Sequence, residues 1–317
     1  MLALAAWIGG CAAAKPPAPA DPGPIRFFAR ADLPLARAQI NGVDVGFMLL
    51  DSGSSTSVLD GRVADRLRLP RQGQMPIIGI GGRMMADTCR LNDLWVGGRS
   101  LGPRFATIVD LSPLSKNIGW PMAGIVGFDC LRDGVFTVDL VDGSISFPQG
   151  AGTTPIANDP SAIPPGAAIC ELRMVAGLPA VPGVIGGYRN VWLQIDTGSN
   201  GSLALPSEAI RRFPDLLAGH ANTAGQDTGV AGVGNTIISR AATVGVFGTQ
   251  LNDVAIQVEL PTGSGPLLSD PTRPDLVPIV VGRMGNQVLR QFRITFDLPH
   301  HRLWAVRRPL PPGSPAR

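Results

Sequence analysis

Hydrophobic residues along this chain come in short runs, and turn residues separate the runs. Gly and Pro, with 40 and 30 copies among 317 residues, interrupt nearly every apolar segment. Strands of about four to eight residues, bounded by turn residues, produce such a pattern. Residues 61–69 and 206–213 differ, because their apolar side chains recur every three or four positions, which predicts short helices. We therefore expect an all-β protein with few helices.

The pattern of apolar and polar positions occurs twice. Residues 40–60 (INGVDVGFMLLDSGSSTSVLD) align without a gap with residues 185–205 (IGGYRNVWLQIDTGSNGSLAL). A Gly-rich hairpin, a second hairpin and a final Asp-containing hairpin then follow in the same order in each copy. An internal repeat of this length indicates two homologous structural units, and a chain of 317 residues is long enough for two domains.

The repeat divides the chain into two lobes and three connecting or terminal segments. We predict a first lobe at residues 25–150 and a second lobe at residues 166–308. Residues 151–165 are a Pro- and Gly-rich linker, residues 1–24 a leader with a Pro- and Ala-rich tether, and residues 309–317 a tail.

Composition excludes several classes of protein. The chain is 44% hydrophobic and 16% charged, so it can bury cores and does not resemble a disordered chain. The net charge of +3 is small and unclustered, which gives no reason to expect nucleic-acid binding. No run reaches the roughly 18 apolar residues of a membrane span. His220, His300 and His301 lack the spacing of metal ligands, and we expect no metal or other cofactor.

Each copy of the repeat ends an apolar strand with an acidic motif. Asp51-Ser52-Gly53-Ser54 in the first copy falls on Asp196-Thr197-Gly198-Ser199 in the second. If the lobes pack about a pseudo-twofold axis, the two Asp carboxyl groups meet, and the glycines permit the close approach. Two carboxyl groups at that distance share one proton. The ionised one can activate water while its protonated partner polarises a carbonyl group, which is general acid–base hydrolysis of an amide.

The residues around the two aspartates have predicted supporting roles. We expect Ser52 and Thr197 to form hydrogen bonds across the axis and to brace the pair. We expect Ser54 and Ser199 to donate hydrogen bonds to the outer carboxylate oxygens, which would lower the pKa of the ionised carboxyl group.

Paired apolar-apolar-Asp-[Ser/Thr]-Gly motifs resemble those of the aspartic peptidases, the pepsin and retropepsin superfamily. In that family a Gly-rich flap and an apolar-apolar-Gly motif follow each Asp motif. Ile125-Val126-Gly127 matches in the first lobe, and either Arg283-Met284-Gly285 or Val280-Val281-Gly282 takes this place in the second. The resemblance implies two β-barrel lobes with the active site in the cleft between them. It also implies a monomeric aspartic endopeptidase in which catalytic Asp51 and Asp196 act on an extended peptide or protein substrate.

Two Gly-rich hairpins, at residues 77–84 and 229–236, are the predicted flaps. We expect them to close over a peptide that pairs with their edges by strand addition. Apolar walls would favour hydrophobic residues beside the cleaved bond and would come from Ile78, Ile80, Val230 and Val233. Positive φ angles for hinge motion would come from Gly79, Gly81, Gly232 and Gly234. Two flaps resemble the retropepsin dimer and one flap resembles pepsin, and both alternatives stay open.

Two other motifs have a structural and a functional interpretation. Asp227-Thr228-Gly229 spells the same triplet, but it does not follow an apolar strand and is predicted to be a loop. The segment Gly98-Arg99-Ser100-Leu101-Gly102 fits the nucleophile elbow of serine hydrolases, although its surroundings predict strand–turn–strand. The alternatives to a peptidase are therefore an inactive peptide-binding or inhibitory protein of the same fold and a serine hydrolase that uses Ser100.

The N-terminal residues resemble a bacterial lipoprotein signal. An apolar run leads into Ile8-Gly9-Gly10-Cys11, and a Pro- and Ala-rich tether follows. The resemblance implies that Cys11 is lipidated and that the protein is periplasmic, with the lipid as its membrane anchor. No Lys or Arg precedes the apolar run, so an incidental Cys11 is the alternative. Cys89, Cys130 and Cys170 remain, and they fit either a bridge between Cys89 and Cys130 or free thiols.

Overall fold

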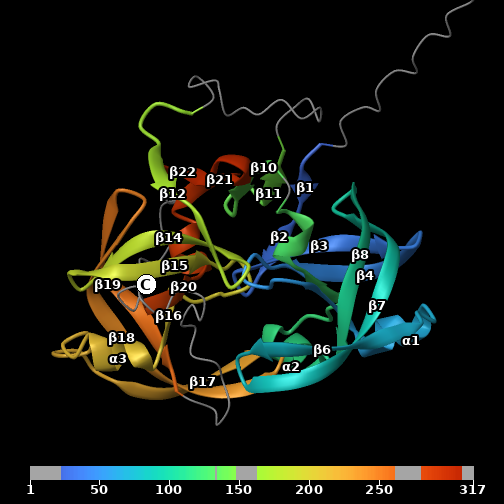
Figure 1. Ribbon diagram of the computed structural model, residues 1–317, viewed down its shortest axis with the longest axis horizontal. Coiled ribbons are helices and arrows are strands. Elements are labelled where there is room, and N and C mark those ends of the chain that lie inside the picture. Colours follow the sequence, from blue (N-terminus) through green and yellow to red (C-terminus); the bar gives the residue numbers. More distant parts are fainter. Residues whose placement is uncertain (1–22, 133, 148–162, 261–279, 309–317) are drawn as a thin grey trace, which may run out of the picture.

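The structure, a computed structural model, describes residues 23–132, 134–147, 163–260 and 280–308. It has two lobes, each built on an eight-stranded sheet, and one six-stranded sheet that joins them (Figure 1). In the view of Figure 1 the first lobe is blue to teal, the second yellow to orange, and the joining sheet lies between and above them. The prediction of a two-lobed all-β fold is confirmed.

The sheet of the first lobe has the strand order β2-β3-β4-β9-β5-β8-β7-β6, and a further pairing of β3 with β7 closes it into a barrel. Its strands are β2 (Phe28–Arg30), β3 (Leu33–Ile40), β4 (Val43–Leu50), β5 (Ser57–Asp60), β6 (Arg71–Gly79), β7 (Gly82–Val96), β8 (Arg99–Val109) and β9 (Gly124–Val126). Its helices are α1 (Gly61–Arg66), α2 (Ser112–Ile118) and η1 (Phe128–Cys130). Helix α1 begins after Asp60, whose carboxylate accepts a hydrogen bond from the Arg62 amide at 3.0 Å.

The second lobe repeats this order strand by strand, as β13-β14-β15-β20-β16-β19-β18-β17, and the β14–β18 pairing closes it in the same way. Its strands are β13 (Arg173–Val175), β14 (Leu178–Ile185), β15 (Tyr188–Ile195), β16 (Leu203–Pro206), β17 (Thr223–Gly229), β18 (Gly232–Val246), β19 (Thr249–Glu259) and β20 (Val280–Met284). Its helices are α3 (Glu208–Arg212) and α4 (Asn286–Leu289). Helices α1 and α3 lie within the two segments that the periodicity of the sequence predicts to be helical.

The joining sheet takes strands from both halves of the chain, in the order β1-β11-β10-β21-β22-β12. They are β1 (Ile25–Arg26), β10 (Val135–Asp139), β11 (Ser144–Ser146), β12 (Ala168–Glu171), β21 (Phe292–Asp297) and β22 (Arg302–Arg307), with η4 (Leu298–His300) between the last two in sequence. At its centre β10 pairs with β21, and the Thr137 and Thr295 hydroxyl groups lie 2.8 Å apart. Buried Phe136 and Phe296 stack beside them at 4.6 Å. Thr137 and Thr295 are equivalent residues of the two lobes, and their contact marks the pseudo-twofold axis.

Several sequence predictions concern segments that the structure describes little or not at all. Most of the predicted leader, linker and tail, and Cys11 with them, lies outside the described residues. Within the described ranges no helix is long and apolar enough to cross a membrane. Cys89, Cys130 and Cys170 are free thiols, so of the two alternatives the structure has no bridge between Cys89 and Cys130.

Candidate active site

The two predicted catalytic aspartates directly follow the ends of equivalent strands. Asp51 follows β4 and Asp196 follows β15, and each of these strands lies parallel to a neighbour, β9 or β20. The Asp51 amide donates to the Val126 carbonyl group at 3.0 Å, and the Asp196 amide donates to that of Met284 at the same distance. A hydrogen bond to the neighbouring parallel strand therefore fixes the backbone of each aspartate.

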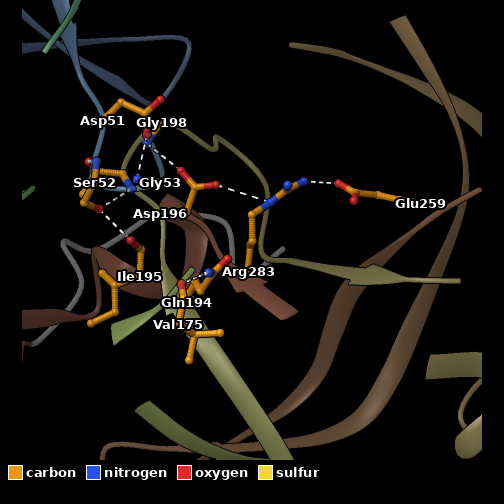
Figure 2. A network of polar contacts seen from close by, with 11 residues as sticks. Asp51, Ser52, Gly53, Val175, Gln194, Ile195, Asp196, Gly198, Glu259 and Arg283 are labelled. Carbon is orange, nitrogen blue, oxygen red and sulfur yellow. Dashed lines mark hydrogen bonds and ion pairs between the residues drawn. The ribbon is translucent and has the colours of Figure 1, made fainter. Parts of the chain in front are cut away.

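Each aspartate packs its carboxyl group against the glycine of the opposite lobe. A Cβ atom on Gly53 would lie 2.4 Å from the Asp196 Cγ atom, and one on Gly198 would lie 2.3 Å from the Asp51 Cγ atom. Any side chain larger than hydrogen at these positions would overlap a carboxyl group. The two amides also donate hydrogen bonds within their own motifs, from Gly53 to Asp51 at 2.8 Å and from Gly198 to Asp196 at 3.0 Å (Figure 2). The structure thus brings the two carboxyl groups together.

Ser52 and Thr197 brace the aspartates through hydrogen bonds that all cross between the lobes. The Ser52 amide donates to the Thr197 hydroxyl at 3.0 Å, and the Thr197 amide donates to the Ser52 hydroxyl at 3.1 Å. The Ser52 hydroxyl donates to the Ile195 carbonyl group at 2.6 Å, and the Thr197 hydroxyl to that of Leu50 at 2.8 Å. Both side chains are buried, so the reciprocal bonds hold the residues beside the aspartates in fixed positions.

The predicted role of the next serines is not what the structure shows. Ser54 donates its hydroxyl to the Thr56 carbonyl group at 2.8 Å rather than to Asp51. No hydrogen bond joins the Ser199 hydroxyl to the Asp196 carboxylate in the part of the chain that the structure describes. Both residues instead close a turn, because their amides donate to the Asp51 and Asp196 carbonyl groups at 3.3 Å. The prediction is wrong for Ser54 because its hydroxyl bonds to a backbone carbonyl group of its own turn and not to the carboxylate.

The two carboxyl groups differ in their electrostatic surroundings. Burial and the charge of Asp196 raise the pKa of Asp51 to about 8. Burial also raises the pKa of Asp196, but Arg283, with its Nε atom 3.5 Å from the Asp196 Oδ2 atom, and a hydrogen bond from Asp51 oppose that rise. Arg283 thus favours ionisation of Asp196 over that of Asp51, so the two carboxyl groups differ in their affinity for a shared proton.

Arg283 is the residue that creates this asymmetry, and the strand registers identify its counterpart. Arg283 lies opposite Gln194, as Ile125 lies opposite the equivalent Leu49. On the other side Arg283 lies opposite Ala204 and Ile125 lies opposite Val58, because β16 is shifted by one residue from the gap-free alignment with β5. Arg283-Met284-Gly285 is therefore the counterpart of Ile125-Val126-Gly127, which decides between the two alternatives. Arg283 also forms an ion pair with Glu259 (Figure 2). The sequence had shown a cation in an apolar motif without assigning it a role.

The two predicted flaps meet at their tips. The β6–β7 hairpin turns at Ile80 and Gly81, and the β17–β18 hairpin turns at Val230 and Ala231. A Cβ atom on Gly81 would lie 2.5 Å from the backbone of Gly232, and one on Gly229 would lie 2.8 Å from the Ile80 Cβ atom. In Figure 1 strands β6 and β17 extend toward each other from the two lobes. Both lobes thus contribute a hairpin to the same contact.

Some details of the flap prediction are wrong. Gly81 and Gly232 have positive φ angles of 95° and 124°, whereas Gly79 and Gly234 lie in regular strand pairs. Ile78 and Val233 were expected to form apolar walls, but they are 50% and 53% exposed. Side chains alternate between the two faces of a strand, so Ile77, next to Ile78, faces inward. In the second flap the inward-facing residue is Asp227, which pairs with Gly234 beside Val233.

The remaining predicted flap residues, Ile80 and Val230, lie at the flap tips, and the Asp227-Thr228-Gly229 triplet directly precedes Val230. Val230 packs against an apolar cluster of the first lobe, and Ile80 lies beside Gly229 of the second flap. Asp227-Thr228-Gly229 is not a loop but the end of strand β17. Its turn-like composition was misleading because pairing with β18 decides its conformation.

Ser100 lies in a hairpin and not in a nucleophile elbow. It is an exposed residue of β8, paired with Trp95 of β7, and its hydroxyl accepts a hydrogen bond from the Gly102 amide at 3.2 Å. A strand–turn–helix, which the elbow requires, is absent at these described residues.

A comparison with known families agrees with this geometry. Residues 36–130 match the family model described as aspartyl protease, and this segment includes Asp51 and the first flap. No curated protein matches the chain. The second lobe repeats the matched segment in strand order and places Asp196 at the position equivalent to Asp51. The match covers most of the first lobe, so this part of the chain is similar to an aspartyl protease, and the two-lobed all-β fold agrees with that similarity.

Proposed function

We propose that this protein is an aspartic endopeptidase with Asp51 and Asp196 as its catalytic pair. The observation that carries the proposal is the reciprocal packing of each carboxyl group against the glycine of the other lobe. A buried pair that holds a single proton provides an acid and a base side by side.

The hydrolysis uses these two states in one cycle. Asp196 accepts a proton from a water molecule as its oxygen forms a bond to the carbonyl carbon of the scissile amide. Asp51 donates its proton to the carbonyl oxygen, which gives a tetrahedral intermediate. The C–N bond then breaks as the nitrogen takes the proton from Asp196 and Asp51 recovers one from a hydroxyl of the intermediate. Arg283 favours this cycle because it stabilises the ionised state of Asp196.

We further propose that the substrate is an extended peptide held between the aspartates and the touching hairpins, whose strands can pair with its backbone. From the sequence, we propose a monomeric periplasmic lipoprotein with its lipid on Cys11. The membrane proposal has its own test, because the Cys11→Ser variant should then leave the membrane fraction and become soluble.

Single substitutions of the two aspartates test the proposed reaction. Asp51→Asn and Asp196→Asn should each lower kcat for cleavage of a protein substrate such as casein by at least about a thousandfold. The double variant should be little worse than either single variant, since the two groups act as a unit. Circular dichroism checks that each variant stays folded.

A matched substitution distinguishes the alternatives. Ser100→Ala should retain the activity of the unchanged protein. Loss of activity in Ser100→Ala, with activity retained in Asp196→Asn, would instead favour a serine hydrolase. Peptide binding by a folded wild-type protein that hydrolyses no peptide would favour the inactive binding protein.

A further inference from the structure

Residues at equivalent positions on the two sides of the aspartates have opposite chemistry. In the first lobe they are Ile77 on the flap, Val109 at the end of β8 and Ile125 in β9, here called the first flank. The strand registers align them with three residues of the second lobe, called the second flank: Asp227, Glu259 and Arg283. Three apolar side chains thus correspond to three charged ones.

The first flank belongs to a continuous apolar cluster. Val109 and Ile125 are buried within it, 5% and 1% exposed, and Ile77 packs against it. Leu49 and Val58, which lie opposite Ile125 on the neighbouring strands, belong to the same cluster. The tip of the second flap, Val230, also reaches this cluster. Val109 and Ile125 are too deeply buried to touch a bound molecule, so the apolar contact on this side would come from the partly buried Ile77, which they support.

The second flank contains more negative than positive charge. Arg283 pairs with both Glu259 and Asp196. The negative charge of Asp227 interacts electrostatically with Arg283, Glu259 and Asp196. Asp227 forms no ion pair with any residue that the structure describes. The side chains of Arg283 and Glu259 are 20% and 31% exposed, so they are within reach of a bound molecule. The second flank thus contains two acidic residues and one basic residue.

The surroundings of the second flank are polar as well. Leu49 of the first lobe corresponds to Gln194, and Ala86 corresponds to Thr236, which pairs with Glu259. The Thr236 side chain is buried, and its hydroxyl has no hydrogen-bond partner among the residues that the structure describes. Among the described residues no three His, Cys, Asp or Glu side chains gather as metal ligands.

We propose that the second flank binds a cationic Lys or Arg side chain of the substrate, while the first flank binds an apolar side chain on the opposite side of the scissile bond. This inference rests on the proposed peptidase activity and names its substrate class. Asp227 would supply the counter-charge. A buried apolar side chain at the second flank would leave the Asp227 carboxylate desolvated, with only the hydrogen bond from the Thr228 amide, and an acidic side chain would be repelled by it.

Cleavage-site profiling tests this specificity directly. The purified full-length protein is incubated with a mixture of peptides of all sequences, and the cleaved bonds are identified by mass spectrometry. We expect Leu, Phe, Met or another apolar residue on one side of the bond and Lys or Arg on the other. Apolar residues on both sides, or an acidic residue at the second position, would overturn the inference and leave the peptidase proposal intact.

Substitution of Asp227 locates the preference on the second flank. Asp227→Asn should lower kcat/KM for a peptide with Lys beside the bond by about tenfold, the equivalent of about 1.4 kcal/mol. It should raise kcat/KM for the matched Leu peptide, because the variant no longer has a carboxylate for that side chain to desolvate. Asp215→Asn, an exposed residue of the same lobe, is the control and should alter neither value. Equal losses for both peptides would contradict the assignment.

A binding experiment separates this inference from the proposed reaction. Asp51→Asn keeps the site without its acid, and its neutral amide resembles the protonated carboxyl group of Asp51. Fluorescence anisotropy should show that this variant binds the labelled Lys peptide about tenfold more tightly than the Leu or Glu peptide. This preference would stand even if the unchanged protein cleaved nothing. Equal affinity for the three peptides would reject it.

Discussion

On the strand that supports its aspartate, the first lobe has Ile125 and the second lobe has Arg283, in the same register against both neighbouring strands. In contrast, Ser52 and Thr197 both have a hydroxyl group, and the amide of each donates a hydrogen bond to the hydroxyl of the other. The difference lies in what each side chain contacts. Ser52 and Thr197 bond directly to the opposite lobe, so a change in one would leave the other unpaired. Ile125 and Arg283 each contact residues of their own lobe, so this position can change its chemistry without the loss of a hydrogen bond to the other lobe.

The strongest test of this comparison replaces the cation of the second flank. Arg283→Ile introduces the residue of the first lobe but leaves Glu259 and Asp196 without their counter-charge. We expect it to lower the free energy of unfolding by about 3 kcal/mol, because the loss of one partner leaves buried charge unpaired. Urea denaturation followed by fluorescence measures this change.

A triple variant provides the matched control for that substitution. Asp227→Ile, Glu259→Val and Arg283→Ile together copy the whole first flank and leave Asp196 as the one acid without a cation. The triple variant should recover most of the stability that the single variant loses, since apolar groups often replace buried ion pairs without cost. A triple variant that is less stable than Arg283→Ile would contradict the equivalence of the flanks.

The flap tips offer a second comparison between the lobes. Gly81→Val and Gly232→Val each place a β-branched residue at a positive φ angle, and Gly81→Val also overlaps the opposite hairpin. We expect Gly81→Val to reduce kcat/KM by about tenfold or more, through a strain of about 1–3 kcal/mol in the tip. Gly232→Val should produce a comparable loss if both hairpins act as flaps. An effect of Gly81→Val alone would indicate one working flap.

The pH dependence tests the asymmetry of the aspartates. Because Asp51 must be protonated to act as the acid, kcat should fall as the pH rises through about 8, about tenfold for each further unit. Folding favours the protonated form of Asp51, whose folded-state pKa lies above the ordinary value of 3.8. Its contribution to stability is thus fully present in acid and is lost between about pH 4 and pH 8.

Thermal unfolding measures that contribution. Asp51→Asn cannot ionise, so its Tm relative to the unchanged protein should rise over this pH range. A constant difference in Tm from pH 4 to pH 8 would mean that Asp51 is not the carboxyl group with the raised pKa.

The smallest expected effect concerns the pseudo-twofold axis itself. Thr137→Val or Thr295→Val removes one partner of the hydroxyl pair and should cost about 1 kcal/mol of unfolding free energy. The double variant should cost less than the sum of the two, because it leaves no unpaired hydroxyl group. Strictly additive losses in urea denaturation would show that the two hydroxyl groups are not coupled across the axis.

The sequence predicted well what depends on local repetition. Asp51 and Asp196 could be matched because the same apolar run and glycine surround each of them, and the order of hairpins followed from the same repeat. It predicted poorly what depends on strand pairing. The positive φ angle of Gly81 and the extended backbone of Gly79 follow from which residues pair across the hairpin. Composition alone does not give that register.

Charge at the second flank shows the same limit. Asp227, Glu259 and Arg283 are far apart in the sequence, and they come together only when β17, β19 and β20 take their places in one barrel. Asp227 looked like part of a turn because Asp, Thr and Gly are common in turns. An aligned comparison of both copies, including the positions where an apolar residue becomes charged, was the signal that could have identified the flank.

The joining sheet places a constraint on how such a molecule can diversify. If two identical copies of one lobe associated through β10, every residue beside the aspartates would occur on both sides of the substrate. A mutation that suited one half of an asymmetric peptide would then be imposed on the other half. Because β10 and β21 belong to one continuous chain, their lobes can accumulate different substitutions while the Thr137–Thr295 contact keeps them in register. Covalent linkage thus allows a molecule with a symmetric backbone to read a substrate that has direction.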